Sequence, residues 1–132
     1  MIEKKDGKLF VGSFIVEPTT TLDEFRKTEA GERAKVLVQN GDWVTFQIDE
    51  ERGYGLNATF KNQRLQNAKI YLINSSSWSD WSEEKELQKK AKHDELLMRL
   101  LGKPPYRFSW GEVESIFDKR GGSSSIVINY TQ

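Results

Sequence analysis

Cysteine is absent from this chain, and histidine occurs once, as His93. Without cysteine the protein can form no disulfide bond, thiolate nucleophile or cysteine metal site. His93 has no second histidine with which to hold zinc, and its immediate neighbours on a helix would point in other directions. We therefore expect no metal site and no histidine-based catalysis, and we interpret His93 as a solvated residue of a helix.

An excess of either charge is also missing, because twenty basic and twenty acidic residues cancel. A neutral chain produces no overall field that would attract nucleic acid or an anionic membrane. The first residues, MIEKKDGKLF, contain no apolar signal-peptide core, and no apolar run is long enough to cross a bilayer. These absences predict a cytoplasmic location for the chain as it stands, with no nucleic-acid and no membrane partner.

No phosphate-binding loop is present, since neither the GYG at 53–55 nor Gly121-Gly122 matches a nucleotide fingerprint. The serines at 75–77 and 123–125 lack the spacing of a nucleophile elbow. We therefore expect no cofactor and no enzymatic activity. An enzyme that uses acid–base carboxylates alone, such as a hydrolase, is the remote alternative.

Aromatic residues are well represented, at 11%, beside a low apolar fraction of 36% and a high charged fraction of 30%. Disordered chains lack such aromatic content, so this chain is expected to fold. Its 132 residues are expected to form a single domain, residues 1–132.

The stretch Trp81 to Gly102 predicts one long helix, at about residues 81–101. Apolar side chains recur there at helical spacing and predict a stripe that faces a sheet: Leu87, Ala91, Met98 and Leu101, widened by Leu97 and Leu100. Asp80 gives an N-terminal capping signal, and Gly102 followed by Pro104 predicts the end of the helix.

The rest of the chain mostly alternates like β-strands. We expect a first strand at Lys8 to Val16, a short helix at about residues 22–28 that Thr21 caps, and two hairpins. The hairpins join 34–39 to 43–48 through Asn40-Gly41, and 56–60 to 65–73. Residues 110–120 fit a helix or a strand, and we favour the strand because 125–130 needs an antiparallel neighbour.

The predicted fold class is therefore α+β: a mostly antiparallel sheet of about six or seven strands, with the long helix packed on one face.

Aromatic side chains in or near predicted loops are candidates for a binding surface. They are Trp43, Tyr54, Trp78 and Trp81. Trp43 alternates with an apolar face of its strand, so it should lie on the open face of the sheet if the long helix covers the other. Trp78 and Trp81 fit a binding platform or, as the favoured interpretation, a lid that packs at the start of the helix.

Three carboxylates near the end of the chain, Glu112, Glu114 and Asp118, share one face if their segment is a strand. Such a face can hold a hard cation when backbone carbonyls join it. The favoured interpretation is an acidic patch exposed to solvent.

The ending of the chain resembles a group of small uncharacterised bacterial proteins that share W-G-x-V-x-S-x-x-D followed by a short I-x-I-x-Y strand. The matching positions are Trp110, Gly111, Val113, Ser115, Asp118, Ile126, Ile128 and Tyr130. The resemblance brings no catalytic residues. It implies a small module of the kind that often serves as an immunity protein or inhibitor.

These observations together predict a non-enzymatic module that binds another protein, such as an immunity protein that neutralises a bacterial toxin. The alternative is a small-molecule binder with a pocket between the helix and the sheet.

Overall fold

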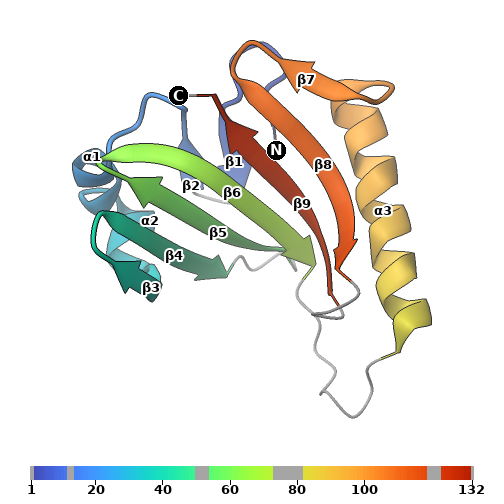
Figure 1. Cartoon of the computed structure of the whole chain (residues 1–132), viewed down its shortest axis with the longest axis horizontal. Coiled ribbons are helices and arrows are strands. Elements are labelled where there is room, and N and C mark those ends of the chain that lie inside the picture. The colour runs from blue at the N-terminus through green and yellow to red at the C-terminus, as the bar shows by residue number, and fades with distance from the viewer. Residues whose placement is uncertain (1, 12–13, 50–53, 73–81, 119–122, 132) are drawn as a thin grey trace.

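The structure is a computed structural model that describes residues 2–11, 14–49, 54–72, 82–118 and 123–131 (Figure 1). Its main element is a seven-stranded sheet with the order β3-β4-β5-β6-β9-β8-β7. The strands are β3 (Lys35–Asn40), β4 (Trp43–Asp49), β5 (Tyr54–Lys61), β6 (Arg64–Leu72), β7 (Tyr106–Phe108), β8 (Gly111–Asp118) and β9 (Ser123–Tyr130). All neighbours in this sheet are antiparallel. With three helices added, the predicted α+β fold is confirmed.

The sheet consists of two meanders. One runs from β3 to β6 and the other from β7 to β9, and pairing between β6 and β9 joins them. Both turns use positive φ: Gly41, which follows the last residue of β3, has φ of 60°, and the β5–β6 turn places Asn62 and Gln63 at φ of 50° and 72°. Positive φ at the central residues matches the twist of a tight hairpin. Both predicted hairpins, and the strand at residues 111–118, are therefore confirmed.

One face of the sheet forms the core. A row of residues paired in register crosses five strands: Phe46, Ala58, Ala68, Ile128 and Val113. Each of them is at most 3% exposed. Apolar residues in a single row across the sheet require covering elements on that side, because the hydrophobic effect scales with the apolar area removed from water.

Different helices cover the two ends of this inner face. Helix α3 (Glu83–Leu101) packs against β8 and β9, and Figure 1 shows it running alongside β8. The other end is covered by α1 (Leu22–Arg26), whose Phe25 ring lies 4.9 Å from Phe46 and 5.4 Å from Phe60. The prediction of one long helix on one face is confirmed, but α1 rather than α3 covers the apolar side of β4.

The predicted apolar stripe of α3 was correct for Leu97 and Leu101, which are buried, and wrong for Leu87 and Met98. The buried residues of the helix are Glu86, His93, Leu97 and Leu101, whereas Leu87 and Met98 are 47% and 48% exposed. Apolar residues near the end of the helix fit two different stripes. The observed one is stabilised by Glu86, whose carboxylate accepts hydrogen bonds from the Ser124 amide at 3.2 Å and from Lys89 Nζ at 3.0 Å. A buried carboxylate that is paired in this way does not force its face outward.

Helix α3 begins at Glu83, where the Ser82 hydroxyl accepts a hydrogen bond from the Lys85 amide at 3.1 Å. The capping role expected of Asp80 falls outside the described residues. The predicted end is confirmed, since Gly102 follows the helix with φ of 87°. Within the described ranges, no helix is long and apolar enough to span a bilayer.

The N-terminal third departs from prediction in two places. Helix α1 ends at Arg26 rather than near residue 28, because Thr28 caps a second helix, α2 (Glu29–Arg33), and accepts a hydrogen bond from the Gly31 amide. The single strand expected at Lys8 to Val16 is a hairpin of β1 (Leu9–Val11) and β2 (Phe14–Val16). Folding back buries both Leu9 and Val16 against the same core.

Candidate functional site

The candidate site is the outer face of the seven-stranded sheet, which we call the open face. It carries the side chains that alternate with the core row: Trp43, Thr45 and Gln47 on β4, Asn57, Thr59 and Lys61 on β5, Asn67 and Lys69 on β6, Val127 and Asn129 on β9, and Glu112 and Glu114 on β8. Nearly all of these residues are polar, whereas their neighbours on the inner face are apolar. Alternation of this kind marks a sheet with one face in water.

Trp43 lies at one end of the open face, as the sequence predicted from its alternation with Val44. The indole is 42% exposed, and Lys61 Nζ lies 5.0 Å from the centroid of its ring. A cation above the ring holds the side chain by an electrostatic attraction. Beside it, Thr45 and Thr59 form a hydrogen bond of 2.9 Å between their hydroxyls. This end therefore presents a large aromatic side chain on an ordered polar surface.

Hydrogen bonds also order the middle of the open face. Gln47 Nε2 donates to the Tyr71 hydroxyl at 3.0 Å, and that hydroxyl donates to Asn57 Oδ1 at 3.4 Å. The Tyr71 ring lies directly over Gly55, where any β-carbon would collide with it. Glycine is thus required at this position for the ring to lie flat on the strand.

The three predicted carboxylates lie on the outer side of β8. Glu112, Glu114 and Asp118 pair with Asn129, Val127 and Ser123 of β9, which places them on one face as expected. Arg107 Nε lies 3.8 Å from Glu112 Oε1 in an ion pair whose side chains are 77% and 54% exposed. Exposed pairs of this kind contribute little free energy and leave both charges available to a partner.

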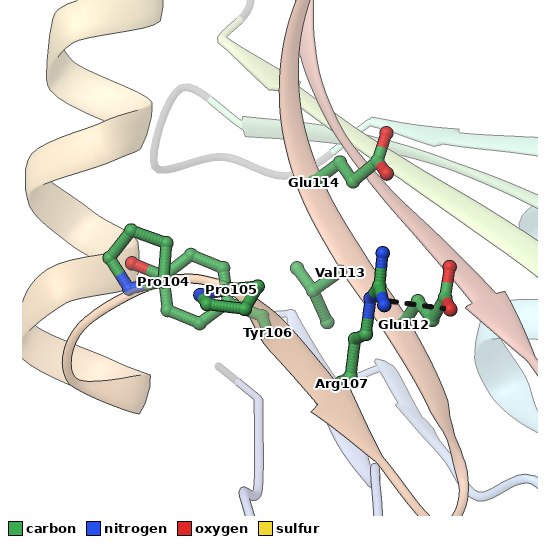
Figure 2. A pocket seen from close by; sticks show the side chains of 7 residues that line it. All are labelled: Pro104, Pro105, Tyr106, Arg107, Glu112, Val113 and Glu114. Atoms are coloured by element: carbon green, nitrogen blue, oxygen red, sulfur yellow. Dashed lines mark ion pairs between the residues drawn. The ribbon is translucent and has the colours of Figure 1, made fainter.

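A shallow pocket of about 180 Å³ opens between these charges and the segment that follows α3. Figure 2 shows Pro104 and Pro105 on one side and the Arg107–Glu112 pair on the other. Among the described residues, no group of three histidine or acidic side chains is arranged to hold a metal ion. The pocket therefore offers both signs of charge rather than a cation site.

The predicted site residues do not converge on one point. Trp43 on β4 and the carboxylates on β8 are separated by four strand spacings, about 19 Å. Tyr54 begins β5, but its side chain lies outside the described residues, as do Trp78 and Trp81 entirely. The structure therefore supports an extended surface with an aromatic end and a charged end, rather than a single cleft.

Two buried titratable residues were missed by sequence reasoning. The interpretation of His93 as a solvated residue was wrong, because its side chain is 0% exposed and burial lowers its pKa. Glu86 is likewise buried, 6% exposed, at the other end of the same helical face. Their spacing from Leu97 and Leu101 is helical. The buried stripe therefore fits helical periodicity only when polar residues are counted as part of it.

Residues that carry the resemblance to small bacterial proteins mostly support the fold. Trp110 Nε1 donates to the Lys4 carbonyl at 2.9 Å, and its ring stacks on Phe108 at 4.9 Å. The Tyr130 hydroxyl donates to the Gly7 carbonyl at 3.0 Å, and burial raises the pKa of Tyr130. These contacts tie the N-terminal segment to the last strands, so this part of the motif describes the architecture rather than a reaction.

The chain matches no protein-family model and no curated protein sequence. A chain in the solved structure of Rhs1-CT in complex with cognate immunity protein RhsI1 is similar to it, with a TM-score of 0.63 and 15% sequence identity. The two chains share a fold. The superposition covers 98% of this chain and 85% of that chain, so the shared architecture includes nearly every element described above.

Proposed function

We propose that this chain is a non-enzymatic module that binds another protein, in the manner of an immunity protein that neutralises a toxin. The observation that carries the proposal is the fold, shared over 98% of the chain with one member of a complex between Rhs1-CT and its cognate immunity protein. That fold presents one face of a seven-stranded sheet to solvent, and a protein partner is the ligand that such a broad surface fits best.

The chemistry of the open face supports a protein partner. Trp43 supplies an aromatic anchor, and tryptophan is enriched among the residues that contribute most to protein interfaces. Lys61 lies over its ring, and Lys69, Glu112 and Glu114 place charges of both signs farther along the same face. Charges placed in this way select a partner and speed its association more than they add affinity.

The size of the pockets also favours a protein over a small molecule. Three pockets lined by described residues hold about 180 to 290 Å³, and each opens at the surface. Sites for small ligands more often enclose about 300 to 1,000 Å³. Between α3 and the sheet, the space expected for a ligand is occupied by His93, Leu97 and Leu101, each at most 3% exposed.

The proposal is tested by affinity capture from a lysate of the source organism. Tagged wild type is compared with a Trp43→Ala/Glu112→Lys/Glu114→Lys variant and with a control that carries Leu87→Ala and Met98→Ala on the solvent side of α3. Circular dichroism first establishes that all three proteins fold. We expect wild type and the control to retain the same stoichiometric protein, and the open-face variant to lose it.

The captured partner is then expressed alone and together with this chain. Growth arrest by the partner that wild type relieves, and the open-face variant does not, is the expected result for an immunity protein. A partner that binds without affecting growth would leave a binding module but refute the immunity role. Equal capture by all three folded proteins would refute the assignment of the open face.

A further inference from the structure

The two halves of helix α3 are held against the sheet in different ways. In the first half, residues 83–95, the apolar residues are Leu87 and Ala91, and both are exposed. In the second half, all four leucines of residues 96–101 are buried or pack against the core. A helix in a folded protein is stabilised mainly by burial of an apolar face. The second half is docked in this way, and the first half is not.

Glu86 joins the first half of α3 to the sheet. Its side chain is 8% exposed, and its carboxylate accepts hydrogen bonds from the Ser124 amide of β9 at 3.2 Å and from Lys89 Nζ at 3.0 Å. The Ser124 hydroxyl in turn donates to the backbone carbonyl of Glu86. Hydrogen bonds to a charged group are stronger than those between neutral groups. We call the contact of Glu86 with Ser124 the latch.

The other buried side chain of this half opposes docking. His93 is 0% exposed, and neither of its ring nitrogens has a hydrogen-bond partner among the described residues. On β8, the hydroxyl of Ser115, which shares the inner face with Val113, is also buried without a partner in the described part of the chain. Water would satisfy these atoms if the helix moved away from the sheet. Their burial therefore costs free energy, which the latch must offset.

Ser115 lies beneath the first half of the helix. The start of α3 and the end of β8 meet at the latch, since Phe117 pairs with Ser124. From there α3 and β8 run side by side (Figure 1). Ser115 is about 7 Å from Phe117 along β8. His93 is about 10 Å from Glu86 along α3. Ser115 is therefore covered by the turns of α3 between Glu86 and His93.

The far end of α3 is tied to the sheet by the chain itself. The helix ends at Leu101, and after four residues the chain enters β7 at Tyr106, which pairs with Val113 of β8. The leucines of residues 96–101 add apolar contacts at the same end. Movement of α3 away from the sheet is therefore restricted at this end, whereas at the other end it is restricted by the latch.

We propose that residues 83–95 of α3 form a lid over the inner face of β8 and β9, which the latch holds closed and which swings about residues 96–101. The sheet stays folded when the lid opens. Opening uncovers apolar side chains such as Ile126, which pairs with Ser115 and is 0% exposed when the lid is closed. The lid and the open face lie on opposite sides of the sheet, so the lid does not depend on the proposed partner.

Thiol labelling tests the lid, because the chain has no cysteine of its own. Ser115→Cys places a thiol beneath the lid, and Val44→Cys places one at a buried residue of β4, at the other end of the inner face. Relative to the unfolded proteins, we expect Ser115→Cys to react at least tenfold faster than Val44→Cys. Its rate should also depend less on urea, because local opening exposes less surface than unfolding. Equal rates with equal urea dependence would overturn the proposal.

Variants of the latch test what holds the lid closed. Glu86→Ala should raise the labelling rate of Ser115→Cys about tenfold or more, because the Ser124 amide loses a charged acceptor. Glu84→Ala removes the same charge from an exposed position of the helix and should leave the rate unchanged. Ser124→Ala removes the hydroxyl on the sheet side of the latch and should also raise the rate, which keeps the test available if Glu86→Ala does not fold.

A variant remote from the lid separates local opening from unfolding. Phe25→Leu weakens the packing of α1 against Phe46 and should raise the labelling rate of Val44→Cys. It should leave the rate of Ser115→Cys unchanged, because the lid opens without disturbing α1. An equal rise for both thiols would show that the thiol beneath α3 is reached only by unfolding. That result, or a rate for Ser115→Cys that no folded latch variant changes, would refute the proposal.

Discussion

His93 has more buried atoms without a hydrogen-bond partner than any other residue that the structure describes. Its ring is fully buried on the inner side of α3, and neither ring nitrogen has a hydrogen-bond partner among the described residues. Burial lowers the pKa of His93 below its usual value of 6.5, while the neighbouring Asp94 carboxylate acts in the opposite direction. The folded state therefore binds a proton less readily than the unfolded state does.

This difference predicts an acid-sensitive fold. Well above pH 6.5 the ring is neutral in both states and causes no pH dependence. As the pH falls below that value, the unfolded state takes up a proton that the folded state excludes, and stability decreases. His93→Leu should remove this loss and raise the free energy of unfolding by about 1 kcal/mol, because two unpaired nitrogens disappear.

Urea unfolding of wild type and His93→Leu across a series of pH values measures the effect. The difference in stability between the two proteins should be constant well above pH 6.5 and should widen as the pH falls through and below that value. Parallel decline of both proteins would assign the acid sensitivity to carboxylates instead.

Sequence alone did not reveal these two residues, and the reason is physical. A lone histidine and a glutamate among lysines are typical of a solvated helix face, and only the position of the Ser124 amide makes burial of Glu86 favourable. That amide belongs to a strand almost forty positions away in the chain. Local patterns do not contain such a contact. Trp43 was predictable, because its exposure follows from strict alternation with Val44.

At the level of elements, the rotation of α3 about its axis is the feature with the clearest energetic consequence. Leu97 faces the sheet and is fully buried, whereas its neighbour Met98 is 48% exposed. Leu97→Ala should lower the free energy of unfolding by about 2 to 5 kcal/mol, because it removes packed methyl groups and leaves a cavity. Met98→Ala should change it by less than about 0.5 kcal/mol.

Chemical denaturation of the two variants at neutral pH decides the rotation. Equal losses, or a greater loss for Met98→Ala, would refute the observed packing of α3. Met98 was wrongly assigned to the buried stripe because 96–98 and 100–101 are all apolar, so helical periodicity alone fits more than one face.

Elements with their own local signals were predicted well, and elements that depend on docking were not. Gly41 and the helix cap Thr21 specify backbone geometry within a few residues: Gly41 takes a positive φ, and Thr21 accepts a hydrogen bond from the Glu24 amide. Helix α2 and the β1–β2 hairpin are too short to be stable alone, so they form because Ala30, Leu9 and Val16 reach the core.

At the scale of the whole molecule, the strand order depends on a pairing that no local sequence pattern predicts. Pairing of β6 with β9 sets the strand order and brings Asn67 beside Asn129 on the open face. Within the seven-stranded sheet, the strands of the two predicted hairpins and the strand at 111–118 were correct, but their order across the sheet was not accessible to periodicity. The candidate surface was consequently predicted as separate residues rather than as a continuous face from Trp43 to Arg107.

The pairing of β6 with β9 also has a consequence for how the chain folds. Residues 35–72 and 83–130 each form mostly from neighbours in sequence, and the described register between β6 and β9 consists of only four residue pairs. Among the strand pairings of the seven-stranded sheet, this one joins residues farthest apart in the chain and loses the most chain entropy, so its formation should limit the folding rate. Ile128→Val, in the pairing of β9 with β6, should therefore slow refolding. Val44→Ala, which is remote from that pairing, should mainly accelerate unfolding. Stopped-flow refolding and unfolding rates of the two variants distinguish them, and equal refolding rates would place the rate-limiting step elsewhere.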